Sequence, residues 1–556
     1  MKFHAIFFII FAEHYQDLHS PERKLNLPIF AKKIMHTQIQ LILTPEQAEK
    51  QELLIVKVAE ALKTTPKHIN RIRTVRKSID ARSFQVKINL TVDVFMDEEA
   101  PTDLYEPFNY PNVSAAKPVL VIGGGPAGLF AALKLIENGL KPILLERGKK
   151  AKERVHDIAK LNLKKGFNPE SNYCFGEGGA GTFSDGKLYS RSKKKGNLQR
   201  VYEIFHYHGA AEDILFEAHP HIGSDKLPTI VDNISKTIEN CGGEIHFGQK
   251  LVEIVTENNK VKGCKTESGE FFEAEALILA TGHSAHDIYE MLHNQNIALE
   301  LKGFAMGVRV EHPQTLIDSI QYHSKERNEY LPAASYSLVE QVNERGVYSF
   351  CMCPGGRIVP AGTSETGIVV NGMSASRRNS PFANSGIVVE IRPEDIPEEF
   401  KEYGTLAGLK FQQHIEHLAY LNNGGQGQTA PAQRMLDFVK GKVSADLPEC
   451  SYMPGLISSP LHFWLPDIIS SRLKEGFKKF DRKMRGYLTN EAVVVGVETR
   501  SSSAVRIPRN PESGMHPDLQ GLFPAGEGSG FSGGITSSAI DGENAALSVL
   551  RYFENA

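Results

Sequence analysis

The stretch at residues 119–148, VLVIGGGPAGLFAALKLIENGLKPILLERG, decides the fold. It begins with the apolar run 119–122, which is typical of a buried parallel strand. Residues 129–138 are rich in Ala and Leu and predict a helix that ends before Gly139. A second apolar run, 142–145, leads to an acidic residue. The stretch therefore predicts one β-α-β unit at the centre of an α/β domain.

Three glycines follow the first predicted strand at the spacing G-x-G-x-x-G: Gly123, Gly125 and Gly128. In such a unit the first glycine allows a tight turn, the second lets a pyrophosphate approach the backbone, and the third lets helix and strand pack closely. The helix N-terminus adds free N–H groups and the positive end of a dipole. Glu146, 18 residues after Gly128, is placed to accept hydrogen bonds from a ribose. The full context favours a dinucleotide site over a purely structural Gly-rich turn.

Two later segments favour FAD over NAD as the ligand. Residues 521–546, GLFPAGEGSGFSGGITSSAIDGENAA, resemble the closing segment of FAD-dependent oxidoreductases of the glutathione-reductase-like superfamily. Residues 276–282, ALILATG, resemble the strand that carries the A-T-G motif of that superfamily. Residues 175–188 (FGEGGAGTFSDGKL) and 371–389 (NGMSASRRNSPFANSGIVV) are similar to a family of FAD-dependent dehydrogenases, also called NAD(FAD)-utilizing dehydrogenases.

This resemblance implies FAD as the cofactor and leaves the substrate and the catalytic residues open. In such flavoproteins the closing segment runs under the ribityl chain and the pyrimidine ring. We expect the cofactor contacts to come from Gly123, Gly125, Pro126, Ala127, Gly128, Glu146, Arg147, Gly181, Thr182, Thr281, Gly282, Gly526, Glu527, Gly534, Ile535 and Thr536.

Length and composition limit the other possibilities. A chain of 556 residues predicts two or three domains, and a net charge of −3 gives no general attraction to nucleic acid or to an anionic membrane. Six scattered cysteines without a C-x-x-C pattern are typical of a reducing cytosol and indicate no metal site. Residues 5–12 are apolar but too short to span a bilayer, and no usable signal peptide precedes Met35. We expect a cytoplasmic protein whose true start is Met35.

The predicted fold class is α/β: a Rossmann-like FAD/NAD(P)-binding domain, an inserted α+β cap or substrate domain, and an N-terminal ferredoxin-like α+β module. The β-α-β-β pattern of the module follows residue 35, and Thr44 is its expected helix N-cap. The expected divisions are an extension (1–34), the module (35–100), a linker (101–117), the FAD-binding domain (118–290 and 515–556) and the cap (291–514).

The N-terminal module carries a local basic cluster. We do not expect this cluster to bind nucleic acid, because basic residues on a half-exposed sheet usually form a solvated face and no stacking aromatics lie between them. The same applies to the run Arg191 and 193–195, which we expect to be exposed. The residues of the cluster are Lys63, Lys67, Arg71, Arg73, Arg76, Lys77 and Arg82.

The Gly-rich segment 176–186 predicts an irregular loop beside the cofactor, with Thr182 and Ser184 as hydroxyl donors. His283 is a candidate acid or base, which His286 follows closely. We interpret His283 instead as a loop histidine that only hydrogen-bonds the backbone.

Cysteine spacing argues against disulfide reductase chemistry of the glutathione-reductase type. That chemistry uses a C-x-x-x-x-C pair soon after the first β-α-β unit, where Cys174 stands alone. Cys351 and Cys353, two positions apart on a predicted strand, should point the same way, which fits disulfide geometry poorly. We therefore interpret them as structural thiols rather than as a redox pair or metal ligands.

These observations predict an FAD-dependent dehydrogenase that passes two electrons from a small organic substrate to the flavin. No second G-x-G-x-x-G lies between Gly282 and Gly521, so any nicotinamide nucleotide is expected to bind only transiently. The alternatives are an RNA-modifying flavoprotein, with the N-terminal module holding RNA, and a non-catalytic FAD-binding interaction protein. The oligomeric state is not predicted.

Overall fold

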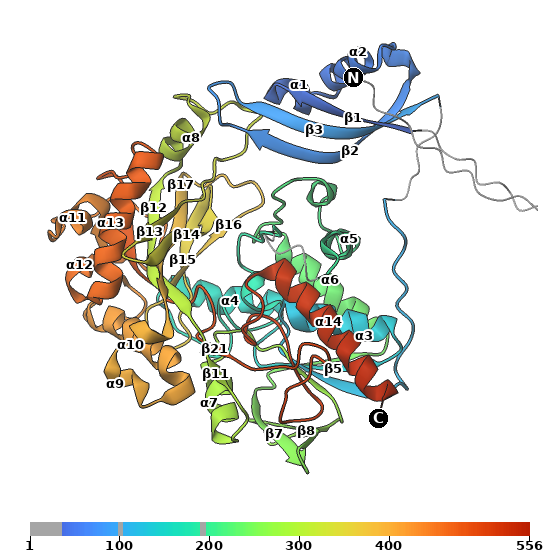
Figure 1. Ribbon diagram of the computed structural model, residues 1–556, viewed down its shortest axis with the longest axis vertical. Coiled ribbons are helices and arrows are strands. Elements are labelled where there is room, and N and C mark those ends of the chain that lie inside the picture. Colours follow the sequence, from blue (N-terminus) through green and yellow to red (C-terminus); the bar gives the residue numbers. More distant parts are fainter. Residues whose placement is uncertain (1–35, 98–103, 190–195, 556) are drawn as a thin grey trace, which may run out of the picture.

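The computed structural model describes residues 36–97, 104–189 and 196–555 (Figure 1). The predicted extension at 1–34, the alternative start at Met35 and the basic run at Arg191 and 193–195 lie outside these residues. Within the described ranges, no helix has both the length and the apolar character needed to cross a membrane.

A five-stranded parallel sheet, in the order β22-β10-β4-β5-β6, holds the first β-α-β unit. That unit consists of β4 (Pro118–Ile122), α3 (Pro126–Glu137) and β5 (Lys141–Glu146), which confirms the predicted pattern. The helix begins three residues before the predicted 129, because proline is well suited to the first helical position. The other strands of the sheet are β6 (Glu244–Phe247), β10 (Leu277–Leu279) and β22 (Leu522–Pro524).

The two faces of this sheet are covered by different layers. Alternate residues of β4 point to opposite faces of the sheet. Val119 and Val121 pack against four helices on one face. Leu120 and Ile122 pack under an antiparallel sheet on the other face. The helices of the first face are α3, α5 (Leu198–Tyr207), α6 (Leu227–Asn240) and α14 (Ile535–Glu554). The second face is covered by β7 (Leu251–Glu257), β8 (Lys260–Thr266), β9 (Phe271–Glu273) and α7 (His286–Asn294).

A seven-stranded sheet, here called the cap sheet, stands beside this domain (Figure 1). It has the order β13-β14-β17-β12-β20-β18-β19. Its strands are β12 (Phe304–Pro313), β13 (Val339–Val342), β14 (Arg345–Cys353), β17 (Phe382–Ile391), β18 (Ala430–Arg434), β19 (Leu456–Ser458) and β20 (Val493–Glu498). Beside it run the hairpin β15 (Gly356–Pro360) and β16 (Val370–Ser374) and the helices α8 (Gln314–Tyr322), α10 (Ala407–Leu421), α11 (Met435–Lys440), α12 (Leu461–Trp464) and α13 (Asp467–Lys483).

The faces of the cap sheet differ in chemistry. On β12, Met306, Val308 and Val310 join the largest apolar core, with α8, α11 and α13. The intervening Arg309 and Glu311 are also buried, and strand alternation turns them to the opposite face. The cap sheet therefore has one apolar face and one face that buries charged side chains.

The N-terminal module lies above both domains in Figure 1. It is an antiparallel sheet in the order β1-β3-β2 with two short helices, and Thr44 caps the first through a capping box with Gln47. These are three strands of the six-element ferredoxin-like motif, so the described module corresponds to part of that motif only. Its elements are β1 (His36–Leu43), α1 (Pro45–Glu49), α2 (Gln51–Leu62), β2 (Ile69–Asp80) and β3 (Lys87–Met96).

The predicted linker packs on the FAD-binding side of the molecule over residues 104–117. Tyr105 hydrogen-bonds His206 of α5 at 2.8 Å, and Phe108 makes an edge contact with Tyr207. Two members of the basic cluster are engaged in ion pairs, since Lys77 lies 3.3 Å from Glu217 and Arg82 contacts Asp80.

Candidate active site

Two of the predicted glycines are required by packing. Gly123 has a φ of +105°, and a Cβ there would collide with the Ala280 carbonyl and lie 3.1 Å from Thr281 Cα. A Cβ at Gly128 would collide with the Gly123 carbonyl. These glycines therefore bring the start of α3 against the A-T-G segment.

Three predicted segments meet around Gly125, at a place here called the glycine junction (Gly125, residues 179–181 and Ile535). A Cβ on Gly125 would have Gly179 Cα, at 3.9 Å, as its nearest neighbour. A Cβ on Gly181 would lie 3.4 Å from Ile535 and 3.5 Å from Pro126. The first turns of α3 and α14 and the Gly-rich loop thus lie side by side.

The glycine junction has the properties of a diphosphate site. Neither α3 nor α14 has a side-chain cap at its N-terminus, so first-turn N–H groups remain for an acceptor. A Cβ added at Gly282, Gly533 or Gly534 would meet nothing within 4 Å, which leaves room along the chain beside the junction. Two helix N-termini and an uncrowded backbone favour a bound anion, and the residues present fit the phosphates of FAD.

The closing segment reaches the same place. A Cβ added at Gly526 would lie only 2.9 Å from the Cβ of Ala127 on α3. The Gly526 N–H donates to the Asp541 carboxylate at 2.8 Å. Gly528 packs directly on the Gly282 carbonyl. Glu527 lies 3.6 Å from His283, whose Nε2 hydrogen-bonds the Arg500 carbonyl at 2.9 Å. The predicted residues of the A-T-G and closing segments therefore come together.

The carboxylate of Glu146 is already hydrogen-bonded by the backbone. It accepts N–H groups from Gly124 at 2.7 Å, Gly148 at 2.8 Å and Gly176 at 2.9 Å. An ionised carboxylate has about four acceptor positions, so one remains for another donor. Its predicted ribose contact remains a prediction.

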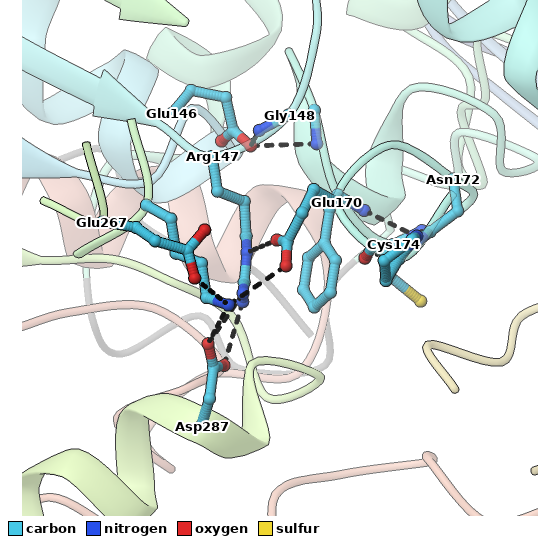
Figure 2. A network of polar contacts seen from close by, with 12 residues as sticks. Glu146, Arg147, Gly148, Glu170, Asn172, Cys174, Glu267 and Asp287 are labelled. Carbon is cyan, nitrogen blue, oxygen red and sulfur yellow. Dashed lines mark hydrogen bonds and ion pairs between the residues drawn. The ribbon is translucent and has the colours of Figure 1, made fainter. Parts of the chain in front are cut away.

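Arg147 opens a second, ionic part of the site (Figure 2). Its guanidinium lies 2.6 Å from Glu170 and forms a bidentate pair with Asp287 at 2.9 and 2.7 Å. Lys250 extends the network to Glu170 at 3.1 Å and to Glu267 at 3.3 Å. This network borders a cavity of about 470 Å³ that is also lined by His286, Glu416, His417 and Arg500.

The two predicted hydroxyl donors, and the hydroxyl of Thr536, turn toward the protein. Thr182 donates to the Glu177 carbonyl at 2.7 Å, and Ser184 donates to the Gly181 carbonyl at 2.8 Å. Thr536 is buried and donates to the Leu188 carbonyl at 2.7 Å. The expectation that the loop hydroxyls face a ligand is therefore wrong in this structure, because they hold the Gly-rich loop in shape and tie its end to α14.

An ionic cluster lies where the Gly-rich loop meets the polar face of the cap sheet. Its members Asp185, Arg309, Cys353 and Glu498 are buried, whereas Lys187 and Cys351 are half-buried. Lys187 Nζ lies 3.3 Å from Asp185 and 3.7 Å from the Cys353 sulfur. Arg378 clamps Asp185 at 3.2 and 2.7 Å. Burial opposes ionisation of Asp185, but Lys187 and Arg378 hold the pKa of its carboxyl well below its ordinary range.

Glu498 is the titratable group of the cluster that is best placed for proton transfer. It is fully buried on β20; one carboxyl oxygen lies 3.0 Å from Arg309 and Oε1 has no hydrogen-bond partner. Burial, only partly offset by Arg309, raises the pKa of Glu498 to about 7. A carboxyl group that titrates near neutrality, and whose second oxygen has no hydrogen-bond partner, can act as a general acid or base.

The histidines behave differently from one another. Burial disfavours the charged form of His283, but Glu527 outweighs it and the pKa of His283 is raised. Burial and the charge of Arg500 lower the pKa of His286 well below its usual value. His283 thus contacts a backbone carbonyl, as expected, and a carboxylate that the sequence did not predict.

The regular-strand argument for the two thiols is wrong. The pairing of β14 with β17 shifts between Phe350 and Cys353, and Cys351 has a φ of +45°. This irregularity breaks the two-residue alternation, and Cys353 lies 3.3 Å from the Cys351 carbonyl. The opposed pair of Arg309 and Glu498 was not predicted either, although a charge inside each of the apolar runs FAMGVRV and VVVGVE was a usable signal.

Comparisons with known proteins support this assignment. Residues 117–288 match the family model described as pyridine nucleotide-disulphide oxidoreductase, residues 303–501 match that of an FAD-dependent protein, C-terminal domain-like, and residues 35–95 match a domain of unknown function. Solved structures with similarity include CtdE in complex with FAD (10% identity, 79% of this chain and 85% of that chain, TM-score 0.31) and the tetracycline destructase Tet(55) (12% identity, 79% and 85%, TM-score 0.32). At these TM-scores the likeness says nothing about substrate or reaction.

The fold, the site and the matched domains define a flavoprotein oxidoreductase that uses FAD. A protein of Clostridium beijerinckii, described as an uncharacterized protein, is 40% identical over 520 residues, which is 90% of this chain and 96% of the relative. The chain belongs to the same family of FAD-dependent oxidoreductases. The prediction of FAD as cofactor is confirmed.

Proposed function

We propose that the chain is an FAD-dependent dehydrogenase that oxidises a small organic substrate between the glycine junction and the cap sheet. The observation that carries this proposal is Glu498, buried with an unpaired Oε1 in the ionic cluster. A carboxylate at this place supports dehydrogenation because removal of a hydride from an alcohol or amine also requires removal of a proton.

The backbone around the glycine junction would hold the phosphates of FAD. The ionic network at Arg147 lies next to the end of β5, where we place the nucleotide end of FAD. When bound, FAD supplies a two-electron acceptor. Glu498 Oε1 takes the proton from the substrate O–H or N–H group. Arg309 holds the other carboxyl oxygen at 3.0 Å and so fixes the direction in which Oε1 points. Lys187 adds a positive charge that favours an anionic substrate group nearby.

An anaerobic substrate screen tests this function. The purified holoprotein is mixed with small hydroxy acids, alcohols and amines, and loss of the oxidised flavin absorbance is followed. We expect saturable bleaching with a compound that carries an anionic group. Bleaching by dithionite but by none of these compounds would contradict the proposed reaction class.

We also propose that nicotinamide nucleotides reduce the holoprotein only weakly, without saturation. The support is that the sequence between Gly282 and Gly521 holds no second dinucleotide fingerprint. Titration of the reduction rate with NADH and NADPH checks this, and saturation in the micromolar range would reveal a nucleotide site that we have not identified.

A further inference from the structure

Cys351 and Cys353 form a close pair because β14 is irregular at this point. In a regular strand, positions i and i+2 are poorly spaced for a disulfide. Here the positive φ of Cys351 and the shifted register change that spacing. The Cys353 thiol donates a hydrogen bond to the Cys351 backbone carbonyl at 3.3 Å, so Cys353 turns back toward Cys351.

The surroundings favour one thiolate in this pair. Lys187 Nζ lies 3.7 Å from the Cys353 sulfur, and Arg309 donates to the Cys351 carbonyl at 2.6 Å. The hydrogen bond from Cys353, then the charges of Lys187 and Arg309, lower the pKa of Cys351 against the effect of burial. The pair therefore shares one proton, and the thiolate is the reactive form of cysteine.

Two other cysteines, Cys264 and Cys450, lack this environment. Burial raises the pKa of Cys264 to about 12 and raises that of Cys450 well above its ordinary value. These thiols are the inert, structural kind. Their raised pKa values distinguish these two cysteines from the C-x-C pair, although the sequence alone predicts structural thiols in both cases.

The pair is also connected to the cofactor site through one short loop. The Gly-rich loop starts at the dinucleotide unit, where Gly178 N–H donates to the Gly124 carbonyl at 2.7 Å. It ends at Lys187, beside Cys353, and at Leu188, whose carbonyl accepts the Thr536 hydroxyl from the first turn of α14. One loop therefore contacts Cys353 through Lys187 and the first turn of α14 through Leu188.

We propose that Cys351 and Cys353 are a second two-electron redox centre, which cycles between dithiol and disulfide by exchanging electrons with FAD. In the oxidising direction a sulfur–sulfur bond forms between Cys351 and Cys353, and the S–H bond of Cys353 breaks. The two electrons and that proton pass to FAD, which becomes the reduced anion FADH⁻. The reactants and the products of this step each carry one negative charge and one transferable proton, so no other reactant is needed.

This centre differs in place from the pair of glutathione-reductase-type enzymes, because it belongs to the cap sheet. Closing so small a ring strains the disulfide and makes it readily reduced, as expected of a redox centre rather than a structural bridge. It would let one chain store two electrons beyond those held by FAD. The inference rests on the FAD cofactor and not on the proposed substrate.

Thiol counting on the native holoprotein tests the proposal without a variant. The chain has six cysteines, and all should react with a thiol reagent after anaerobic reduction and denaturation. After reoxidation with ferricyanide we expect two fewer reactive thiols and a peptide containing Cys351 and Cys353 that is two hydrogens lighter. All thiols still free in a fully oxidised holoprotein would overturn the proposal, as would a disulfide between other cysteines.

Reductive titration gives an independent readout. The native holoprotein should take up two electrons per chain more than its FAD alone requires. Cys351→Ser should lose this extra uptake and keep its FAD, whereas the matched control Cys450→Ser should lose one thiol and keep the extra uptake. Equal uptake by both variants would contradict the assignment. If Cys351→Ser does not fold, the thiol count of the native protein decides alone.

Discussion

The two ends of the site are built from different parts of the chain. At the glycine junction the groups available to a ligand are backbone N–H groups and glycine Cα atoms, from segments whose local sequence prescribes their turns. In the ionic cluster they are side chains from three distant segments: Arg309 and Glu498 contact each other, and Lys187 contacts Cys353.

This difference separates binding from chemistry. Backbone amides cannot titrate, so the glycine junction offers a fixed, pH-independent place for phosphates. Buried side chains that lack full solvation titrate away from their usual pH, and this suits them to move protons and electrons. Damage at the first end should therefore cost the cofactor, whereas damage at the second should cost rate, pH dependence or potential.

The largest effect is expected from Gly125→Val. A branched side chain there would fill the space that faces Gly179 and would exclude the phosphates. We expect a folded protein without flavin absorbance. Gly346→Ala is the control, because its Cβ would make only ordinary contacts. A folded Gly125→Val variant with full FAD occupancy would show that the junction does not hold the cofactor.

Glu498→Gln should spare the cofactor and slow the chemistry. The amide keeps the size of the side chain but cannot take a proton, so flavin reduction by a substrate found in the screen should slow by about 10²–10⁴-fold. Stopped-flow absorbance measures this, with Glu390→Gln, a carboxylate paired with Arg392 away from the cluster, as the control. A rate within a factor of two of the native protein would exclude Glu498 as the proton acceptor.

The same substitution should change how stability depends on pH. The pKa of Glu498 rises from 4.5 to about 7 on folding, so the folded state keeps a proton that the unfolded state releases. Its contribution to the free energy of unfolding is complete below pH 4.5 and is lost as the pH rises to about 7. The loss is on the order of 3 kcal/mol. Urea unfolding at several pH values should show this slope in the native protein and a reduced slope in Glu498→Gln; identical slopes would argue against the shift.

The smallest effect is expected at the start of α14. Two-electron reduction adds negative charge to the flavin pyrimidine edge, which we place at this helix N-terminus. Thr536 is unsuitable for a test because its hydroxyl donates to Leu188, so Ser537→Asp is the better change and Ser537→Asn its neutral control. A carboxylate in the first turn should lower the flavin potential by about 6–20 mV, from a helix-end charge effect of 0.3–1 kcal/mol. An unchanged or raised potential in Ser537→Asp would mean that this helix does not face the pyrimidine.

The sequence predicted the backbone-built part of the site better than the part built from side chains. The strand, turn and helix around Gly123 and Gly125 depend on neighbouring residues, and so does the helix that begins at Ile535, so local patterns predict them. The contact of Arg309 with Glu498 depends on the register of β12 with β20, which shifts at Gly307, and no local pattern contains that information. The direction of the Thr536 hydroxyl depends on Leu188, which lies far away in the sequence.

The thiol pair shows the limit most clearly. A strand rule predicted its geometry, and one residue with a positive φ, Cys351, invalidated that rule. The charges that activate the pair come from Lys187 at the end of the Gly-rich loop and from Arg309 on β12, which β17 separates from β14 in the cap sheet. Only the assembled sheet and loop bring these groups together.

A crystal structure of the oxidised holoprotein tests the central claim most directly. The claim is that one end of the site holds FAD through backbone while the other presents titratable side chains to it. We predict that the diphosphate lies between Gly125 and the Gly-rich loop, and that the flavin ring lies at the start of α14 on the side of Lys187 and Glu498. A flavin ring placed instead in the cavity beside His286 and His417 would contradict the account.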